Sequence, residues 1–491
     1  MNSKSFDFNQ VTFGLPVESY RVDAYVTDDE RLPVVTEYVL RLLRVCGETS
    51  LAAMRDYFGF SDAEALAVVE SLNRQGLITI LDDQLLLSAY AIERFDESSG
   101  DDYPRFTKVE LRRDTATFDL LSFSPLDSRG VGSLGSSSIE LTASLDALEN
   151  SLKRAETAYY HAFAKVMRLK GNSGREQLSV YSVEDISSKK RGFLAVPVTF
   201  SLSEEEQTER TLSHSLDENE APELFSLFHE AVSTATSAKL SLGNNQIDRF
   251  LDEFDVPWMR QYLTGKKFAL HRFAKDVHER SIAAPEGVSA IFGNLYLSQN
   301  VDLLAAQIDR LRSNRKTRLH NSAAWLAPDN NLWGRGSAVG EAFDKLDNSL
   351  RLFSASELSV FWPTKLGDEQ AIAKRLADLG SAKHHAYRAS GTGDPTYGGR
   401  LELFLYPTGI AAALFHLSLP NNHGLLAPVG FVSTRQADIE HVHKLMIQAV
   451  GNGTYGGRIM QSMKNREPQS FEKACAFLHY TDWRAKSTIG A

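Results

Sequence analysis

The chain has 491 residues, of which 43% are hydrophobic and 24% are charged, which is enough apolar material for about two to four folded domains. A net charge of −10 excludes a protein that coats nucleic acid with its whole surface, although it leaves room for a local basic patch. Only two cysteines occur, far apart, and the sequence contains neither a signal peptide nor 18 consecutive apolar residues, which excludes a disulfide framework and predicts a cytoplasmic protein with no membrane span.

The first predicted domain covers residues 31–95. Its first helix begins at Pro33, a residue well suited to the first turn of a helix. A third helix begins at Ser61, whose spacing to Glu64 is that of a capping box, and a β-hairpin follows that turns at Asp82. Three short helices and a hairpin, with the phrase VVESLNRQGLITI, resemble the winged-helix superfamily.

Charge decides between two roles for this domain. It holds six basic and nine acidic residues, and its third helix carries Asp62, Glu64 and Glu70 against Arg74 alone. Because phosphate contacts depend on Lys and Arg, an acidic third helix is a poor DNA reader. We therefore favour packing against another protein over direct reading of DNA.

A heptad pattern follows the flexible-looking segment 129–138. Its apolar positions are spaced alternately by four and three residues, which predicts one long helix over residues 139–170, about 45–50 Å in length. Two interpretations remain open: a helix packed on its own domain, or a coiled-coil homodimer through residues 141–169. The seam consists of Leu141, Leu145, Leu148, Leu152, Ala155, Tyr159, Ala162, Val166 and Leu169.

The second half of the chain alternates predicted strands and helices. This alternation predicts an α/β domain with a mixed sheet, in a chain that is mixed α+β overall. The expected segments are an N-terminal extension (1–30), a winged helix (31–95), strand pairs with the long helix (96–202), an acidic linker (203–221) and the α/β domain (222–491).

Two C-terminal strands, LFHLSLP and APVGFVST, resemble the phospholipase-D-like nuclease fold. In that fold a His-x-Lys element lies on the first of these strands. Here His416 is followed by Leu417 and Ser418, so the lysine is missing. The resemblance therefore implies a degenerate site, and nuclease activity is not carried over.

Motifs for metal, nucleotide or acyl chemistry are missing from the sequence. His441 and His443 are two residues apart, so on a helix they point about 200° away from each other and cannot chelate one ion. No HExxH, GxxxxGK[ST] or GxSxG element occurs. We therefore predict no catalytic residue, no metal and no cofactor.

The pentapeptide TYGGR occurs twice, and each copy follows a Gly-x-Gly element. Glycine permits a close approach to the backbone N–H groups, and the arginine supplies a bidentate donor. The two copies form either a pair of loops around a phosphate or carboxylate, or two similar turns with no ligand. The candidate anion-binding residues are Gly398, Gly399, Arg400, Gly456, Gly457 and Arg458.

Basic residues cluster at two places in this acidic chain. Such a local reversal of charge suits contact with a nucleic-acid backbone, while the alternative is a solvated helix face paired with acids. The candidate nucleic-acid-binding residues are Arg310, Arg312, Arg315, Lys316, Arg318, Lys266 and Lys267.

The sequence favours a non-enzymatic, DNA-associated adaptor with protein partners, of the kind found in bacterial defence or genome-maintenance systems. One alternative is a nuclease or other hydrolase whose histidine and arginine site is not recognisable from the sequence. A second alternative is a ligand-sensing regulator.

Overall fold

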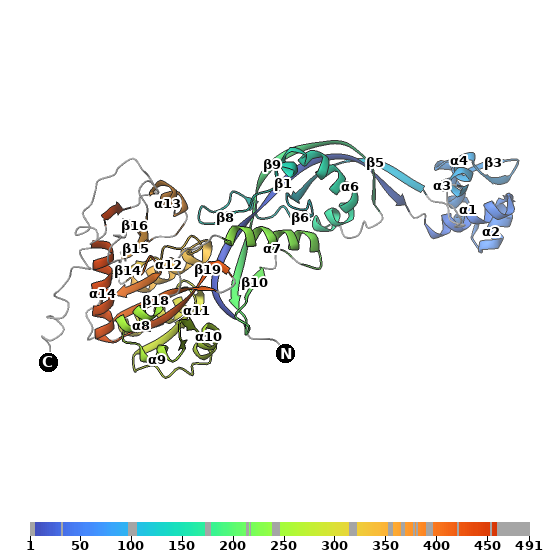
Figure 1. Cartoon of the computed structure of the whole chain (residues 1–491). Helices are drawn as coiled ribbons and strands as arrows, with labels where there is room; N and C mark the ends of the chain where they lie inside the picture. The colour runs from blue at the N-terminus through green and yellow to red at the C-terminus, as the bar shows by residue number, and fades with distance from the viewer. Residues whose placement is uncertain are drawn as a thin grey trace.

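The computed structural model shows a long β-ribbon with a winged helix at one end and an α/β domain at the other (Figure 1). Within the ranges that it describes, no helix is long and apolar enough to cross a membrane. The described residues are 5–30, 33–96, 106–171, 178–212, 216, 218–237, 246–313, 322–351, 357–364, 369–376, 379, 382–388, 396–419, 422–451 and 454–458.

The ribbon consists of three long antiparallel strands, with β1 (Phe6–Glu30) between β5 (Phe106–Asp119) and β9 (Ser179–Leu202). Alternate side chains of β1 are apolar and buried, as expected of a strand with one face on a core. The N-terminal extension that we expected over residues 1–30 is therefore wrong for residues 6–30. Buried apolar side chains along β1 include Phe6, Phe8, Val11, Phe13, Leu15 and Val17.

The expected acidic linker is also partly wrong. Within it, β10 (Thr208–Leu212) pairs with residues 198–202 of β9 and widens the ribbon at its root. Three two-residue strands complete this sheet: β6 (Pro125–Leu126), β7 (Val131–Gly132) and β8 (Ile139–Glu140).

The domain over residues 33–96, which we call the winged helix, is inserted between β1 and β5 and contains the three helices and the β-hairpin that the sequence predicts. Its short strand β2 pairs with a β3–β4 hairpin. At the start of α3, the Ser61 hydroxyl accepts from the Glu64 amide and the Glu64 carboxylate accepts from the Ser61 amide, which is the predicted capping box. The elements are α1 (Val34–Cys46), β2 (Glu48–Ser50), α2 (Leu51–Phe58), α3 (Asp62–Arg74), β3 (Ile78–Leu81), β4 (Gln84–Leu87) and α4 (Ala89–Asp96).

The single long helix predicted over residues 139–170 is wrong. The chain there forms β8, then α5 (Leu145–Glu149), then α6 (Ser151–Leu169), which has non-helical dihedral angles at Ala162. The heptad pattern breaks because Ser144 caps a new helix after the strand. Tyr159 and Val166 of α6 pack on the ribbon, whereas Leu145 is 77% exposed, so only part of the seam is buried within the chain.

The α/β domain is built on an eight-stranded mixed sheet, as predicted, in the order β13-β19-β18-β17-β14-β15-β16-β20. The pairs β14–β15 and β15–β16 are parallel, and every other neighbouring pair is antiparallel. The strands are β13 (Val288–Phe292), β14 (Ser322–Leu326), β15 (Glu357–Pro363), β16 (Lys383–Arg388), β17 (Leu401–Tyr406), β18 (Ile410–Leu419), β19 (Asn422–Ser433) and β20 (Thr454–Arg458).

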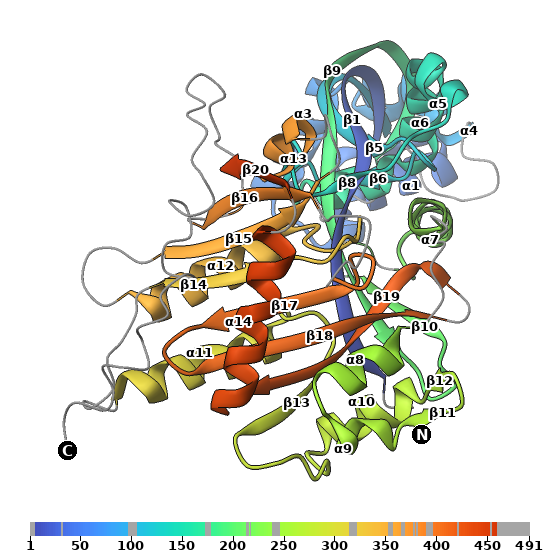
Figure 2. The same ribbon diagram turned by 60° about the vertical axis from the view of Figure 1, so that its left-hand side comes forward.

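Helices cover both faces of this sheet (Figure 2). Leu403 and Leu405 of β17 pack in the core on the side of α8 and α14, while Phe404 and Tyr406 pack in the core on the side of α11 and α12. The helices of this half are α7 (Pro222–Thr236), α8 (Ile247–Glu253), α9 (Pro257–Arg260), α10 (Leu270–His278), α11 (Ser298–Ser313), α12 (Ser337–Leu350), α13 (Glu369–Arg375) and α14 (Gln436–Gly451).

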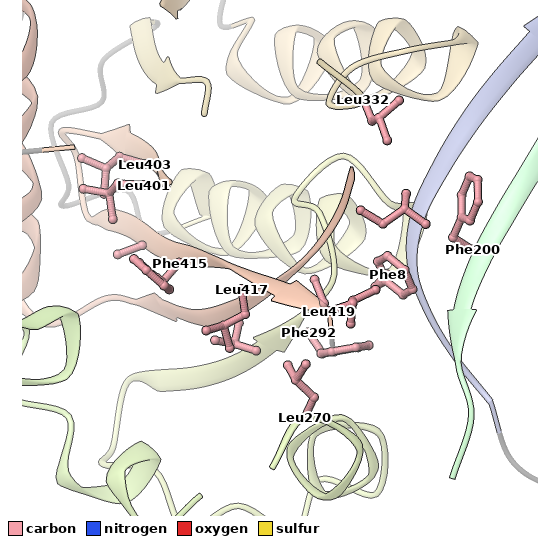
Figure 3. Packing of buried hydrophobic residues seen from close by; sticks show 14 of the residues in the cluster. Phe8, Phe200, Leu270, Phe292, Leu332, Leu401, Leu403, Phe415, Leu417 and Leu419 are labelled. Carbon is pink, nitrogen blue, oxygen red and sulfur yellow. The ribbon is translucent and has the colours of Figure 1, made fainter. Parts of the chain in front are cut away.

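The ribbon is anchored in the α/β domain by a shared core (Figure 3). Phe8 of β1 and Phe200 of β9 lie with their ring centroids 6.5 Å apart and pack beside Leu270, Phe292 and Leu419. The root of the ribbon and the α/β domain therefore form one continuous hydrophobic core.

Candidate functional site

The acidic character of the winged helix persists in three dimensions. Arg55 of α2 donates to both Asp56 and Asp62 at 2.7 Å, so its charge is balanced beside α3. Glu64 is held at the start of α3 by the capping box, and Arg74 is the basic residue of the last turn. This geometry supports the prediction that α3 does not supply phosphate contacts.

Helix α1 carries a second apolar stripe on the side opposite its core face. Val34, Tyr38 and Val45 lie within about 40° of each other around the helix axis and are 69%, 52% and 85% exposed. A surface helix is normally polar on its outer side. The winged helix also holds ten of the sixteen large apolar side chains that are exposed within the described ranges, and the described part of the α/β domain holds none.

The structure places the predicted basic residues in different environments. Arg310 and Arg312 lie in the last turn of α11. The Arg312 guanidinium donates to the carbonyl oxygens of Ser349 (2.8 Å) and Arg351 (3.2 Å), and so supplies hydrogen-bond donors to the carbonyl groups at the C-terminal end of α12. Arg315, Lys316 and Arg318 lie outside the described residues.

The second basic pair lies in the turn between two short strands, β11 (Leu263–Thr264) and β12 (Lys267–Phe268). Lys267 forms an ion pair with Glu206 at 2.8 Å, and Lys266 is exposed. One lysine of this pair therefore already has an acidic partner within the chain.

The first TYGGR copy forms a tight turn before β17. The amides of Arg400 and Leu401 donate to the Thr396 carbonyl, and the Gly399 amide donates to the Thr396 hydroxyl. Arg400 is buried, and its guanidinium donates to the His416 carbonyl at 3.1 Å. Gly398 is exposed at the turn. These internal bonds already use the Arg400 donor that we assigned to an anion.

The second TYGGR copy, with Gly456, Gly457 and Arg458, is strand β20 at the edge of the sheet. Three strands, β14, β15 and β16, lie between β17 and β20, so the two copies are about 19 Å apart across the sheet. This separation is too large for both copies to contact one phosphate.

The histidines of the α/β domain lie in separate environments. His416 is fully buried, and its Nε2 lies 2.8 Å from Glu402, whose other oxygen accepts from the indole N–H groups of Trp325 (3.0 Å) and Trp333 (3.1 Å). His384 instead accepts from Trp362. Within the described part of the chain, no three His, Cys, Asp or Glu side chains gather so that they could hold a metal ion.

A cleft of about 720 Å³ lies beyond the carboxyl ends of parallel strands β14 and β15. Ligands of open α/β sheets bind in such crevices. Residues 328–331, which follow β14, and Thr364, which follows β15, form one side of it. Residues 134–138, which we call the strap, line it from the ribbon side, and a second cavity of about 510 Å³ shares five lining residues with it.

Three cations line the cleft: Arg335 before α12, and Lys374 and Arg375 at the end of α13. Arg335 donates through Nε to the Asn331 carbonyl at 2.8 Å. Arg375 donates to the Trp333 carbonyl and lies over the Trp362 ring, 5.3 Å from its centroid. Within the described ranges, none of the three cations forms an ion pair with a carboxylate.

The two arginines of the cleft are desolvated and close to each other. Burial, reinforced by the positive charge of Arg335, lowers the pKa of the Arg375 guanidinium to about 9, which leaves it cationic at neutral pH. Burial also lowers the pKa of Arg335. The sequence did not single out these residues; the only signal was a buried strand followed by polar residues at 329–331.

Comparisons with known proteins give no family for the chain. No family model matches it, and no curated protein matches it. Among solved structures, it is similar to TrmBL2, described as an archaeal chromatin protein with a novel mode of DNA binding, at a TM-score of 0.17 and 8% identity, over 52% of this chain and 76% of that chain. A TM-score this low establishes no shared fold.

Proposed function

We propose that this protein is a non-enzymatic adaptor that docks a protein partner on the outer face of helix α1, at the far end of the ribbon. The observation that carries this proposal is the exposed stripe of Val34, Tyr38 and Val45 on the side opposite the domain core. Arg41 lies between Tyr38 and Val45 on this face, with its guanidinium 5.5 Å from the Tyr38 ring centroid, so the stripe combines apolar side chains with one cation. Exposed apolar patches bordered by polar side chains mark protein interaction sites in soluble proteins.

The energetics favour a protein partner over a DNA duplex. Full burial of an apolar side chain of this size contributes about 1.5–3 kcal/mol, so the three together supply a substantial part of a micromolar affinity. Binding of a DNA duplex instead requires cationic side chains that contact the phosphates. Arg55, the one Lys or Arg of α2, is already paired with the carboxylates of Asp56 and Asp62. We assign direct contact with DNA, as part of the adaptor role, to Arg310, Arg315, Lys316 and Arg318.

Charge reversal on the outer face of α1 tests the proposal. The full-length chain with Tyr38→Glu and Val45→Glu is compared with wild type by affinity co-purification from the native host, after treatment with nuclease. Because both positions are exposed, we expect the variant to fold and the partner to be lost, with an affinity at least about 100-fold weaker.

Leu145→Glu is the matched control, because Leu145 is an exposed apolar residue of α5 outside the winged helix. It should retain the partner. The proposal is wrong if wild type retains no protein after nuclease treatment, or if both variants retain the same proteins as wild type.

A further inference from the structure

The cleft beyond β14 and β15 is lined by three cations that form no ion pair within the described part of the chain. Arg335 and Arg375 are partly buried, and neither has an acidic partner there, although unpaired buried charges are costly. The Nε atom of Arg375 is enclosed and has no hydrogen-bond partner within the described ranges, so a ligand would reach this arginine through the rest of its guanidinium group. A ligand with negative charge would pair with both cations.

The other polar groups of the cleft limit the class of ligand that can bind there. Asp329 and Glu140 also line it, so the cations do not form a uniformly positive surface. Two neighbouring guanidinium groups match a doubly charged group with several acceptor oxygens. A phosphate meets this requirement, and a single carboxylate meets it less well. The cleft volume of about 720 Å³ lies within the range of small-molecule sites, so it also leaves room for an organic part.

We propose that this cleft binds a small organic phosphate, whose phosphate group is held between the guanidinium groups of Arg335 and Arg375. Lys374, which is exposed at the rim, adds a third positive charge. The hydroxyl groups of Ser136 and Thr364 also line the cleft. They already donate to the carbonyls of Arg375 and Tyr387, so their oxygens can accept hydrogen bonds from a sugar or polyol.

The strap connects this site to the ribbon. The hydroxyl of Ser136 donates to the Arg375 carbonyl at 3.1 Å, and the strap lies between β7, which pairs with β9, and β8, which pairs with β1. A ligand in the cleft would therefore contact the segment that joins two strands of the ribbon. This role goes beyond docking through α1 and does not depend on it.

Calorimetric titration of the full-length protein with ribose 5-phosphate tests the proposal at fixed ionic strength, with inorganic phosphate, ribose and succinate as the comparison ligands. We expect ribose 5-phosphate to bind most tightly, inorganic phosphate more weakly, and ribose and succinate at least tenfold more weakly than ribose 5-phosphate. Absence of phosphate binding to the wild type, or tighter binding of succinate, would overturn it.

Variants locate the binding site. Arg335→Met should weaken binding of ribose 5-phosphate at least tenfold, while Arg335→Lys, which keeps the charge but loses the bidentate donor, should weaken it less. Lys374→Gln alters an exposed side chain, so this variant should fold even if the arginine variants do not. It should weaken binding of ribose 5-phosphate severalfold. Lys153→Gln, an exposed helical lysine of α6, is the matched control. Equal affinities in Lys374→Gln and Lys153→Gln would refute the assignment.

Discussion

The amide of Thr12 in the ribbon donates a hydrogen bond to the carbonyl of Arg335 in the cleft, at 2.9 Å. Arg335 therefore contacts the ribbon through its backbone while its side chain lines the cleft. The next residue, Gly336, adopts a φ of 134°, and a Cβ atom built there would lie 2.4 Å from the Thr12 hydroxyl oxygen. The junction between the ribbon and the α/β domain is thus packed so closely that only glycine fits.

Gly336→Ala should lower the thermal stability of the protein. The added methyl group clashes with Thr12, and the backbone conformation is unfavourable for a residue with a Cβ, so we expect a loss of about 3 kcal/mol. Differential scanning calorimetry measures the change. Thr12→Ala in the same chain should restore part of the loss, and Gly132→Ala, which has open space around the position, should cost little. Equal melting temperatures for Gly336→Ala and Gly132→Ala would contradict this account.

Glu402→Gln should destabilise the α/β domain by about 1–3 kcal/mol, because it disturbs a buried carboxyl group that accepts from two indole N–H groups and lies 2.8 Å from His416 Nε2. Urea denaturation monitored by tryptophan fluorescence follows the change, since Trp325 and Trp333 contact Glu402 directly. Glu341→Gln, on the exposed side of α12, should leave the midpoint unchanged. A Glu402→Gln midpoint within error of wild type would show that the network adds no stability.

Replacement of Arg315, Lys316 and Arg318 by Glu should weaken binding to duplex DNA and reduce its salt dependence by about three in log–log slope, since each phosphate contact contributes about 0.9. The variant spares Arg312, whose side chain satisfies the end of α12. Arg74→Glu in the winged helix should matter less. Fluorescence anisotropy at several salt concentrations measures both. The prediction would be wrong if the wild type did not bind duplex DNA at low salt, or if Arg74→Glu alone abolished DNA binding.

The stability of the protein should fall as the pH drops through about 6.5, in part because of His229. Burial, followed by the positive charge of Arg210, lowers the pKa of His229 in the folded state. A histidine with a lowered folded pKa stabilises the fold above its unfolded pKa, and this contribution is lost at lower pH because only the unfolded state takes up the proton. His229→Gln should flatten the decline in melting temperature between pH 7.5 and about 5.5. His161→Gln, which removes an exposed imidazole from α6, is the comparison, and identical slopes in both variants would refute the assignment.

The sequence predicted correctly those elements that are determined by residues close together in the chain. The capping box of Ser61 and Glu64 involves neighbours in the chain, and the β-hairpin that turns at Asp82 follows α3 directly. The prediction of one long helix failed because Leu141, the first member of the seam, lies in the loop between β8 and α5 although its spacing fits the heptad pattern.

Local sequence patterns could not predict the cleft. Ser136, Arg335 and Arg375 are separated by about 200 and 40 residues, and only the sheet topology brings them together. Their proposed role follows from burial and from the lack of an ion pair within the described ranges, and neither property is encoded in local spacing. The Arg-rich stretch at residues 310–318, by contrast, stands out in the sequence although part of it serves to satisfy α12.

The antiparallel course of β1 has a mechanical consequence. From Thr12, beside Arg335, to Glu30, next to the winged helix, the strand spans about 60 Å at roughly 3.3 Å per residue. The winged helix is inserted between β1 and β5, so it lies about this distance from the cleft. Because the root of the ribbon shares one hydrophobic core with the α/β domain, the ribbon acts as a rigid spacer, and it separates the outer face of α1 from the cleft by several helix diameters.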